Sequence, residues 1–151
     1  MPKSIEGTIE LENNKPVYTL GVASELADIP SHSIRQYIDM GLIIPFKLES
    51  KRHLFSQSDI GRLKLIRELI HDKGLNFAGV RTMMAMVPCW ALRKCSEKDQ
   101  ESCDAYSANF LPCWMASQKG SLCKNMDCRN CEVYHAVDQE AGIKSVLNSL
   151  L

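Results

Sequence analysis

The seven cysteines carry the most evident chemistry in this chain, and all of them lie in its second half. They are Cys89, Cys95, Cys103, Cys113, Cys123, Cys128 and Cys131. An odd number of thiols cannot pair fully within one molecule, and clustered thiols in a reducing compartment indicate metal binding or redox chemistry before structural disulfides. Thiolates are soft ligands for iron–sulfur clusters and zinc. All seven are therefore candidate metal ligands.

These cysteines belong to an imperfect internal repeat. Two motifs occur twice: Pro-Cys-Trp at residues 88–90 and 112–114, and Cys-x-x-Tyr at residues 103–106 and 131–134. Cys128 has no counterpart in the first copy and forms a single C-x-x-C pair with Cys131. Residues 88–135 resemble the two-CW cysteine segments attached to sensor proteins of anaerobic bacteria.

Several chemistries remain open for these thiols. We favour an iron–sulfur cluster, of the 4Fe-4S type, in which four thiolates suffice. Zinc is the alternative, although structural zinc sites usually present two C-x-x-C pairs and only one is present. A thiol–disulfide switch and inert buried thiols are further readings. Neighbouring aromatic residues could shield such a centre or simply form core: Trp90, Tyr106, Trp114 and Tyr134.

The position of the cysteines divides the chain. Residues 1–15 are polar and read as a flexible tail. Residues 16–87 contain no cysteine and form one predicted domain, and residues 88–151 form a small, cysteine-rich, metal-stabilised helical domain. Apolar residues at helical spacing predict a terminal helix from about 135 to 151. The fold class is mainly α.

The first half predicts two short helices across a tight turn. Residues 20–27 form the first helix, capped by Thr19, with Leu20, Ala23, Leu26 and Ala27 on one face. After a turn at 28–31, a second helix runs to about Met40, and Gly41 ends it in a left-handed conformation. Its inward residues are Ile34, Tyr37 and Ile38. Two such helices are a candidate helix-turn-helix.

A basic ribbon and two further helices follow. Residues 42–55 predict a two-stranded ribbon, and Ser56 with Asp59 predicts a capping box for a helix that reaches about Lys73. Asn76 is a predicted N-cap for a helix over 77–86.

This order and several local motifs resemble the MerR family of winged helix-turn-helix regulators. The motifs lie at residues 18–23, 33–37, 41–45 and 59–63, and the run Gly-Leu-Asn-Phe-Ala-Gly-Val at 74–80 is similar to the heat-shock repressor branch. The resemblance implies a homodimer on a near-palindromic duplex operator. It departs from the family pattern at the wing, where Lys51 lies near the usual glycine and His53 aligns with the usual arginine, and at Gln36, which replaces a tyrosine.

The DNA-binding residues that we predict come from the second helix and the ribbon. They are His32, Ser33, Arg35, Gln36, Tyr37, Lys47, Lys51, Arg52 and His53. Long polar side chains of this kind reach base edges or phosphates.

The net charge of the chain is zero, but residues 35–67 hold seven Lys or Arg and three Asp or Glu, a local charge of +4. Such a patch can neutralise phosphates. There is no signal-peptide pattern and no apolar run long enough to span a membrane, so we expect a cytoplasmic protein. We find no nucleotide loop, nucleophile–base pattern or paired carboxylates and expect no enzyme.

The sequence therefore predicts a sequence-specific transcriptional regulator gated by a cysteine-bound centre. Two alternatives are a protein-interaction adaptor with a zinc-stapled tail and a thiol–disulfide redox-sensing regulator.

Overall fold

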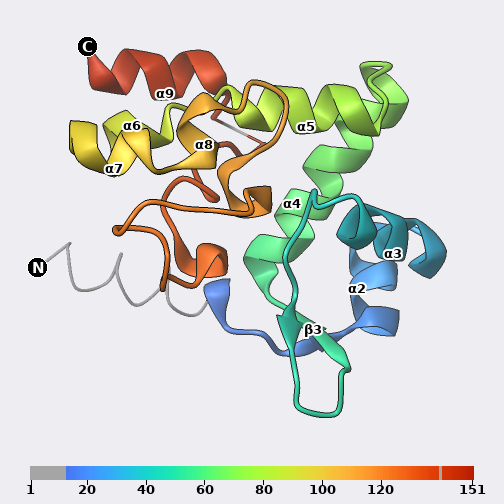
Figure 1. Cartoon of the computed structure of the whole chain (residues 1–151). Helices are drawn as coiled ribbons and strands as arrows, with labels where there is room; N and C mark the ends of the chain where they lie inside the picture. The colour runs from blue at the N-terminus through green and yellow to red at the C-terminus, as the bar shows by residue number, and fades with distance from the viewer. Residues whose placement is uncertain (1–12, 140) are drawn as a thin grey trace, which may run out of the picture. The chain divides into compact units, whose positions relative to one another are not determined.

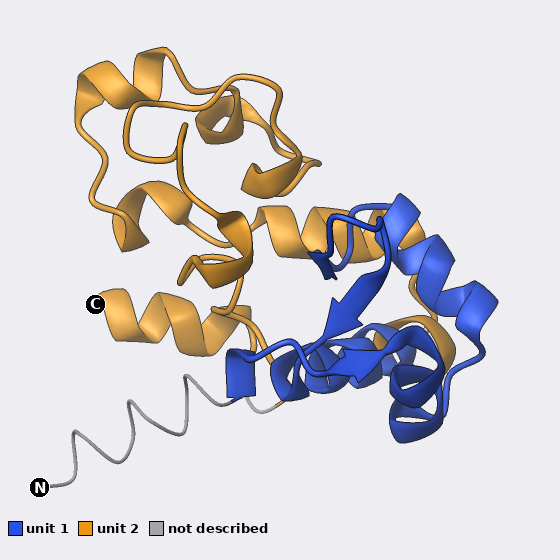
Figure 2. Ribbon diagram, turned by 90° about the horizontal axis from the view of Figure 1, so that it is seen from below, with its two compact units in different colours: residues 1–68 blue, residues 69–151 orange. Residues whose placement is uncertain are grey.

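A computed structural model describes residues 13–139 and 141–151 of the protein (Figure 1). The chain forms two compact units, residues 1–68 and 69–151 (Figure 2). The cysteine distribution predicts a boundary at 87/88, whereas the units divide between Glu68 and Leu69, so the helix that precedes the cysteines belongs to the second unit. Most of the predicted tail, residues 1–12, lies outside the described residues.

The first unit contains the predicted helix pair, α2 at Leu20–Ala27 and α3 at Ser31–Asp39. The Thr19 side chain caps α2 by accepting a hydrogen bond from the Val22 amide at 3.3 Å, as predicted. Gly41 follows α3 with φ of +76°, the left-handed conformation that its position predicts. One inward assignment is wrong: Leu26 is 46% exposed, because the core-facing stripe of this short helix is narrow and centres on Ala23 and Ala27.

The ribbon is present and is part of a three-stranded antiparallel sheet. Strand β2 spans Phe46–Lys47, β3 spans His53–Phe55, and the strand order is β1-β3-β2. Strand β1, Tyr18–Thr19, pairs with β3 and was missed by the sequence reasoning, because two residues show no periodicity.

Helix α4, Gln57–Arg67, begins at the predicted capping box. The Ser56 amide donates to the Asp59 carboxylate at 2.7 Å, and the Asp59 amide donates to the Ser56 hydroxyl at 3.1 Å. The predicted helix to Lys73 is α-helical only as far as Arg67. The next residues, Glu68–Asp72, form a π-helical segment, η1.

The core of the first unit joins α2, α3, α4 and the sheet. Its buried apolar residues include Ala23, Ala27, Ile29, Ile34, Leu42, Ile43, Phe55, Ile60, Leu63 and Ile66. Burial of such side chains contributes about 1.5–3 kcal/mol each. This core holds α3 and the ribbon in a fixed relation, with their polar faces turned to solvent.

The second unit begins with η1 and α5, Phe77–Ala85, which Asn76 caps through a 2.8 Å hydrogen bond from the Gly79 amide. The remainder consists of short helices joined by turns. They are α6 at Cys89–Leu92, α7 at Glu97–Glu101, α8 at Asp104–Ser107, η2 at Cys113–Met115, η3 at Cys128–Asn130 and α9 at Ile143–Leu150.

The terminal helix is shorter than predicted. It begins at Ile143, not near His135, because residues 131–135 form a turn. In that turn the His135 ring lies 2.6 Å from the Arg129 carbonyl. No helix among the described residues is long and apolar enough to cross a membrane.

Candidate functional site

The predicted DNA-contacting residues share two neighbouring elements, α3 and the β2–β3 ribbon. The exposed members are His32, Arg35, Gln36, Lys47, Lys51 and Arg52, and the half-buried members are Ser33 and His53. Their side chains can meet a polar ligand without any repacking of the core.

Tyr37 is the exception within that set. Its side chain is only 3% exposed and packs in the core of the first unit, where burial raises the pKa of its phenol. The residue faces inward because it follows Ile34 by three positions on the buried side of α3. We therefore remove Tyr37 from the surface available to DNA and assign it to packing.

In the ribbon turn, a lysine occupies the position near which the MerR family usually has a glycine. Lys51 has φ of +67°, a left-handed conformation that favours glycine. Its amide donates to the Leu48 carbonyl at 2.9 Å, and the Leu48 amide donates to the Arg52 carbonyl at 2.9 Å. The turn is therefore closed with a lysine in the strained position, which puts a further positive charge at the ribbon tip.

Two arginines of the predicted basic patch have partners within the first unit. Arg62 is 8% exposed, and its Nε donates to the Leu42 carbonyl at 2.8 Å. Arg67 pairs with Asp28 at 3.7 Å and also donates to the Asp28 carbonyl. The local charge of +4 therefore overstates the free positive charge, which is carried chiefly by Arg35, the ribbon and Lys64.

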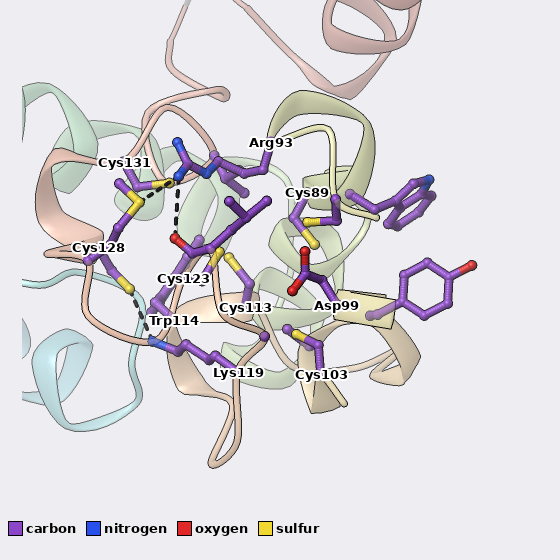
Figure 3. Close-up of a pocket in the computed structure, with 18 of the residues that line it drawn as sticks. Cys89, Arg93, Asp99, Cys103, Cys113, Trp114, Lys119, Cys123, Cys128 and Cys131 are labelled. Atoms are coloured by element: carbon purple, nitrogen blue, oxygen red, sulfur yellow. Dashed lines mark hydrogen bonds between the residues drawn. The ribbon is translucent and has the colours of Figure 1, made fainter. Parts of the chain in front are cut away.

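The second candidate site is a cavity in the second unit, and all seven cysteines line it. Figure 3 shows thiols from α6, from η2 and from the following turns directed toward this one space. The empty volume is about 660 Å³, including solvent at the mouth. All seven cysteines are free, and Cys131 is the buried one. Residues spread over 43 positions of sequence are thus brought to one place, since Cys89 and Cys131 both line it.

The two sequence repeats fold alike around the cavity. Trp90 meets Tyr106 edge to face with ring centroids 5.5 Å apart, and Trp114 meets Tyr134 in the same way at 5.1 Å. Each repeat begins with the same turn, since the carbonyl of each Pro-Cys-Trp proline accepts from the amide three residues later, at 3.1 Å and 3.0 Å. The repeated motifs therefore encode a repeated structure.

Hydrogen bonds between the two copies close the cavity. The Asp104 amide donates to the Gln118 carbonyl at 2.8 Å, and the Ser121 hydroxyl donates to the Asp99 carboxylate. Gly120 lies against Asp99 so closely that a Cβ atom at residue 120 would meet the Asp99 carbonyl oxygen at 2.9 Å. The cysteine segment is thus one structure built from both copies.

Two cations also lie at the cavity wall. Lys119 Nζ donates to the Cys128 thiol sulfur at 3.1 Å, and the Arg93 guanidinium lies close enough to Cys123 and Cys131 to interact with their charges. Arg93 also pairs with Glu132 at 3.6 Å. These cations can compensate negative charge on thiolates.

The surroundings of four cysteines raise the pKa of the thiol in the metal-free protein. Burial, followed by the charges of neighbouring cysteines, raises the pKa of Cys89 to about 11 and that of Cys113 to about 12. Burial also raises the pKa of Cys95 and of Cys123, although Arg93 opposes the shift at Cys123. A metal that binds these thiols must displace their protons, so its affinity should rise with pH.

The thiols surround the cavity without closing on a single point. Among the described residues, no three His, Cys, Asp or Glu side chains are grouped tightly enough to hold one metal ion. A tetrahedral zinc site with Zn–S bonds of about 2.3 Å would draw its sulfurs to about 3.8 Å from each other.

Comparison with known proteins identifies the first part of the chain. The family described as MerR HTH family regulatory protein matches residues 18–87. Residues 18–87 are a MerR-family helix-turn-helix domain. This match joins the first unit to η1 and α5, and it ends one residue before the first Pro-Cys-Trp motif.

Two kinds of curated protein are similar to this MerR-family domain. One is the heat shock protein HspR of Streptomyces coelicolor, 31% identical over 77 residues that cover 51% of each chain. The other is the HTH-type transcriptional regulator GlnR of Bacillus anthracis and Bacillus cereus, also 31% identical over 77 residues, covering 51% of this chain and 59% of GlnR. The chain therefore spans about half the length of the curated relatives that it matches.

The sequence reasoning missed Arg93 and Lys119 as residues of the cysteine cavity. A signal for Arg93 was present in its spacing, because it follows Cys89 by four residues and so lies on the same face if the segment is helical. In the structure the Arg93 amide indeed donates to the Cys89 carbonyl at 2.8 Å. Lys119 lies in an irregular segment, where sequence spacing carries no such information.

Proposed function

We propose that this chain is a transcriptional regulator that binds a duplex DNA operator as a homodimer and whose DNA affinity is gated by a cysteine-bound centre in residues 88–151. The observation that carries the proposal is the joint exposure of α3 and the ribbon on a MerR-family domain. The GlnR relatives are named as transcriptional regulators, which supports the same role here.

Binding is expected to combine base reading by α3 with phosphate contacts from the ribbon. Arg35 and Gln36 carry forked or amide groups that can pair with guanine or adenine edges in the major groove. Lys47, Lys51 and Arg52 contribute positive charge beside it, and each phosphate contact releases counterions.

The first test is a titration of labelled duplex DNA at several salt concentrations. The affinity should fall as salt rises, with a log–log slope of about −0.9 for each phosphate contact. Arg52→Gln should reduce the slope by about two, since each homodimer carries two copies of Arg52, and Glu49→Gln, on the same ribbon turn, serves as the matched control. An affinity that is absent at low salt, or indifferent to salt, refutes the DNA-binding role.

For the gating centre, an iron–sulfur cluster of the 4Fe-4S type suits the donor set best. Seven soft ligands line one cavity with mostly apolar walls, and two cations stand beside them. Their spread around the cavity favours a cluster, in which each thiolate binds a different iron, over a single zinc ion. When bound, such a cluster supplies a centre whose charge and stability respond to oxidants or iron supply.

Gating would act through the contacts between the two repeats. The bonds of Asp104 to Gln118 and of Asp99 to Ser121 join segments that also carry cysteines. Any change in how far apart the thiols stand must therefore shift these segments together. Such repacking, in a homodimer, would alter the spacing of the two α3 helices on an operator.

The identity of the centre is tested by anaerobic purification. A brown protein with absorption near 400 nm and about four irons and four sulfides per chain supports the cluster. A colourless protein that contains zinc by elemental analysis supports instead a protein-interaction adaptor, in which zinc stabilises the cysteine-rich tail. A metal-free protein with reversible disulfides supports a thiol redox sensor.

A further inference from the structure

Arg93 occupies a position that packing alone does not explain. It follows α6 in the first repeat, yet its side-chain hydrogen bonds and its ion pair reach the second repeat. Nη2 lies 2.6 Å from the Met126 sulfur and 3.5 Å from the Leu122 carbonyl, the two dashed lines at Arg93 in Figure 3. Nη1 lies 3.6 Å from Glu132.

One donor of this side chain is left over. Arg93 Nε is buried and has no hydrogen-bond partner among the described residues. A buried N–H without an acceptor costs about 1–3 kcal/mol, so such a group is normally satisfied by a ligand or water. Arg93 shares the cavity wall with Cys123 and Cys131 and is close enough for its charge to interact with theirs.

We propose that Arg93, together with Lys119, forms a cation clamp that stabilises a negatively charged thiolate centre on Cys123, Cys128 and Cys131 and sets its reduction potential. The inference rests on the proposed cysteine-bound centre. It places the stabilised thiolates of that centre in the second repeat. Lys119 supplies the other arm, with Nζ 3.1 Å from the Cys128 sulfur.

Charge and chemistry both favour this role. Thiolate-bound clusters become more negative on reduction, and nearby cations and N–H···S hydrogen bonds raise their potential. A guanidinium presents several donors in one plane and is weakly hydrated, which suits it to a partly buried anion. The charge of Arg93 also acts on Cys95 of the first repeat, but both hydrogen bonds of its Nη2 reach the second repeat, as does the bond from Lys119 to Cys128.

A purely structural role is the rival explanation. The Arg93–Glu132 pair is half-exposed on the Glu132 side, and such pairs contribute about 0–1 kcal/mol. Loss of that pair would lower stability slightly and leave a bound centre unchanged. The variants below separate these roles, since Arg93→Lys keeps the charge and loses the Nε donor.

The first arm uses the full chain, reconstituted anaerobically with ferrous iron and sulfide. Arg93→Gln and Arg93→Lys are compared with Lys94→Gln, which removes an exposed charge one residue away. We expect the reduction potential to move to more negative values in Arg93→Gln, less so in Arg93→Lys, and not in Lys94→Gln. If Arg93→Gln keeps the wild-type potential and iron content, the clamp is refuted while the centre itself stands.

The second arm needs no metal and so separates failure of the clamp from failure of the centre. In the metal-free chain, the rates at which iodoacetate and iodoacetamide label Cys123 are measured by mass spectrometry. Both reagents react with the thiolate, so the thiolate fraction cancels in the ratio of the iodoacetate rate to the iodoacetamide rate. Because only iodoacetate is negatively charged, this ratio reports the local electrostatic potential at Cys123. We expect Arg93→Gln to lower this ratio about threefold at low salt, and Lys94→Gln to leave it unchanged. An unchanged ratio in a folded Arg93→Gln protein overturns the clamp even if wild-type protein takes up no iron.

Discussion

Tyr134 packs edge to face against Trp114, with ring centroids 5.1 Å apart and planes at 85°. The first repeat has the same pair in Tyr106 and Trp90, yet Tyr134 is 2% exposed and Tyr106 is 44% exposed. One sequence motif therefore serves as core in the second repeat and as surface in the first. This asymmetry gives a direct comparison within one molecule.

Tyr134→Ala should destabilise the second unit by about 3–5 kcal/mol, because it empties a buried aromatic site. Tyr106→Ala, which removes the same ring from the same type of pair, should cost about 1 kcal/mol. Both tryptophans lie in the second unit, so denaturant unfolding followed by tryptophan fluorescence reports this unit. Equal losses would show that the two repeats are equally buried in solution.

Lys51→Gly should raise the stability of the first unit by about 0.5–1 kcal/mol, since it relieves a left-handed lysine while adding freedom to the unfolded chain. The same change should weaken DNA binding and reduce its salt slope by about two, one contact from each subunit of the homodimer. Lys51→Gln is the matched variant, because it loses the charge and keeps the strain. Circular dichroism during denaturation measures the stability, and an equal stability for both variants would argue against strain at this turn.

Substitution of Arg62 should affect protein stability and not DNA binding, whereas substitution of Arg52 should affect DNA binding and not stability, although both arginines belong to the basic stretch of sequence. Arg62→Met removes a buried donor to the Leu42 carbonyl and should cost about 2 kcal/mol of stability, with an unchanged salt slope for the folded protein. Arg52→Met should leave the stability within about 0.5 kcal/mol and lower the DNA affinity. Thermal melting and DNA titration of the two proteins check this, and a salt slope that falls in Arg62→Met would restore that residue to the DNA-facing set.

The metal-free protein should lose stability in alkali. The folded pKa values of Cys89 and Cys113, about 11 and about 12, lie above the usual value of 9.0, so the folded state binds protons more tightly than the unfolded state. Their stabilising effect is complete below about pH 9 and is lost as the pH rises toward 11 and 12. Denaturant unfolding from pH 8 to 10.5 measures the fall, which Cys113→Ala should make shallower. A flat profile in the wild type contradicts the burial of these thiols.

The sequence predicts the helices of residues 18–87 well because their signals are local. Thr19, Ser56 and Asn76 cap helices as expected, and Gly41 and Gly74 both adopt positive φ. Each of these features depends on a few neighbouring residues.

Features that depend on distant contacts escaped prediction. Strand β1 exists only because β3 pairs with it, and Arg62 is buried only because the Leu42 carbonyl, 20 positions earlier, lies within its reach. In the same way, the repeat motifs indicate that the cysteines belong to one site. They do not predict the contact of Lys119 with Cys128, because Lys119 lies in an irregular segment without a periodic pattern. The cofactor assignment stays a prediction, since thiol spacing alone fits more than one metal.

DNA affinity with and without the cysteine centre tests the account most directly. One anaerobic preparation is divided, half is stripped with chelator and reductant, and both halves are titrated against the same duplex, selected by this protein from a random pool, at matched salt. We predict dissociation constants that differ by about tenfold between the two halves and that both rise with salt. Equal dissociation constants for loaded and stripped protein would contradict gating by the cysteine centre.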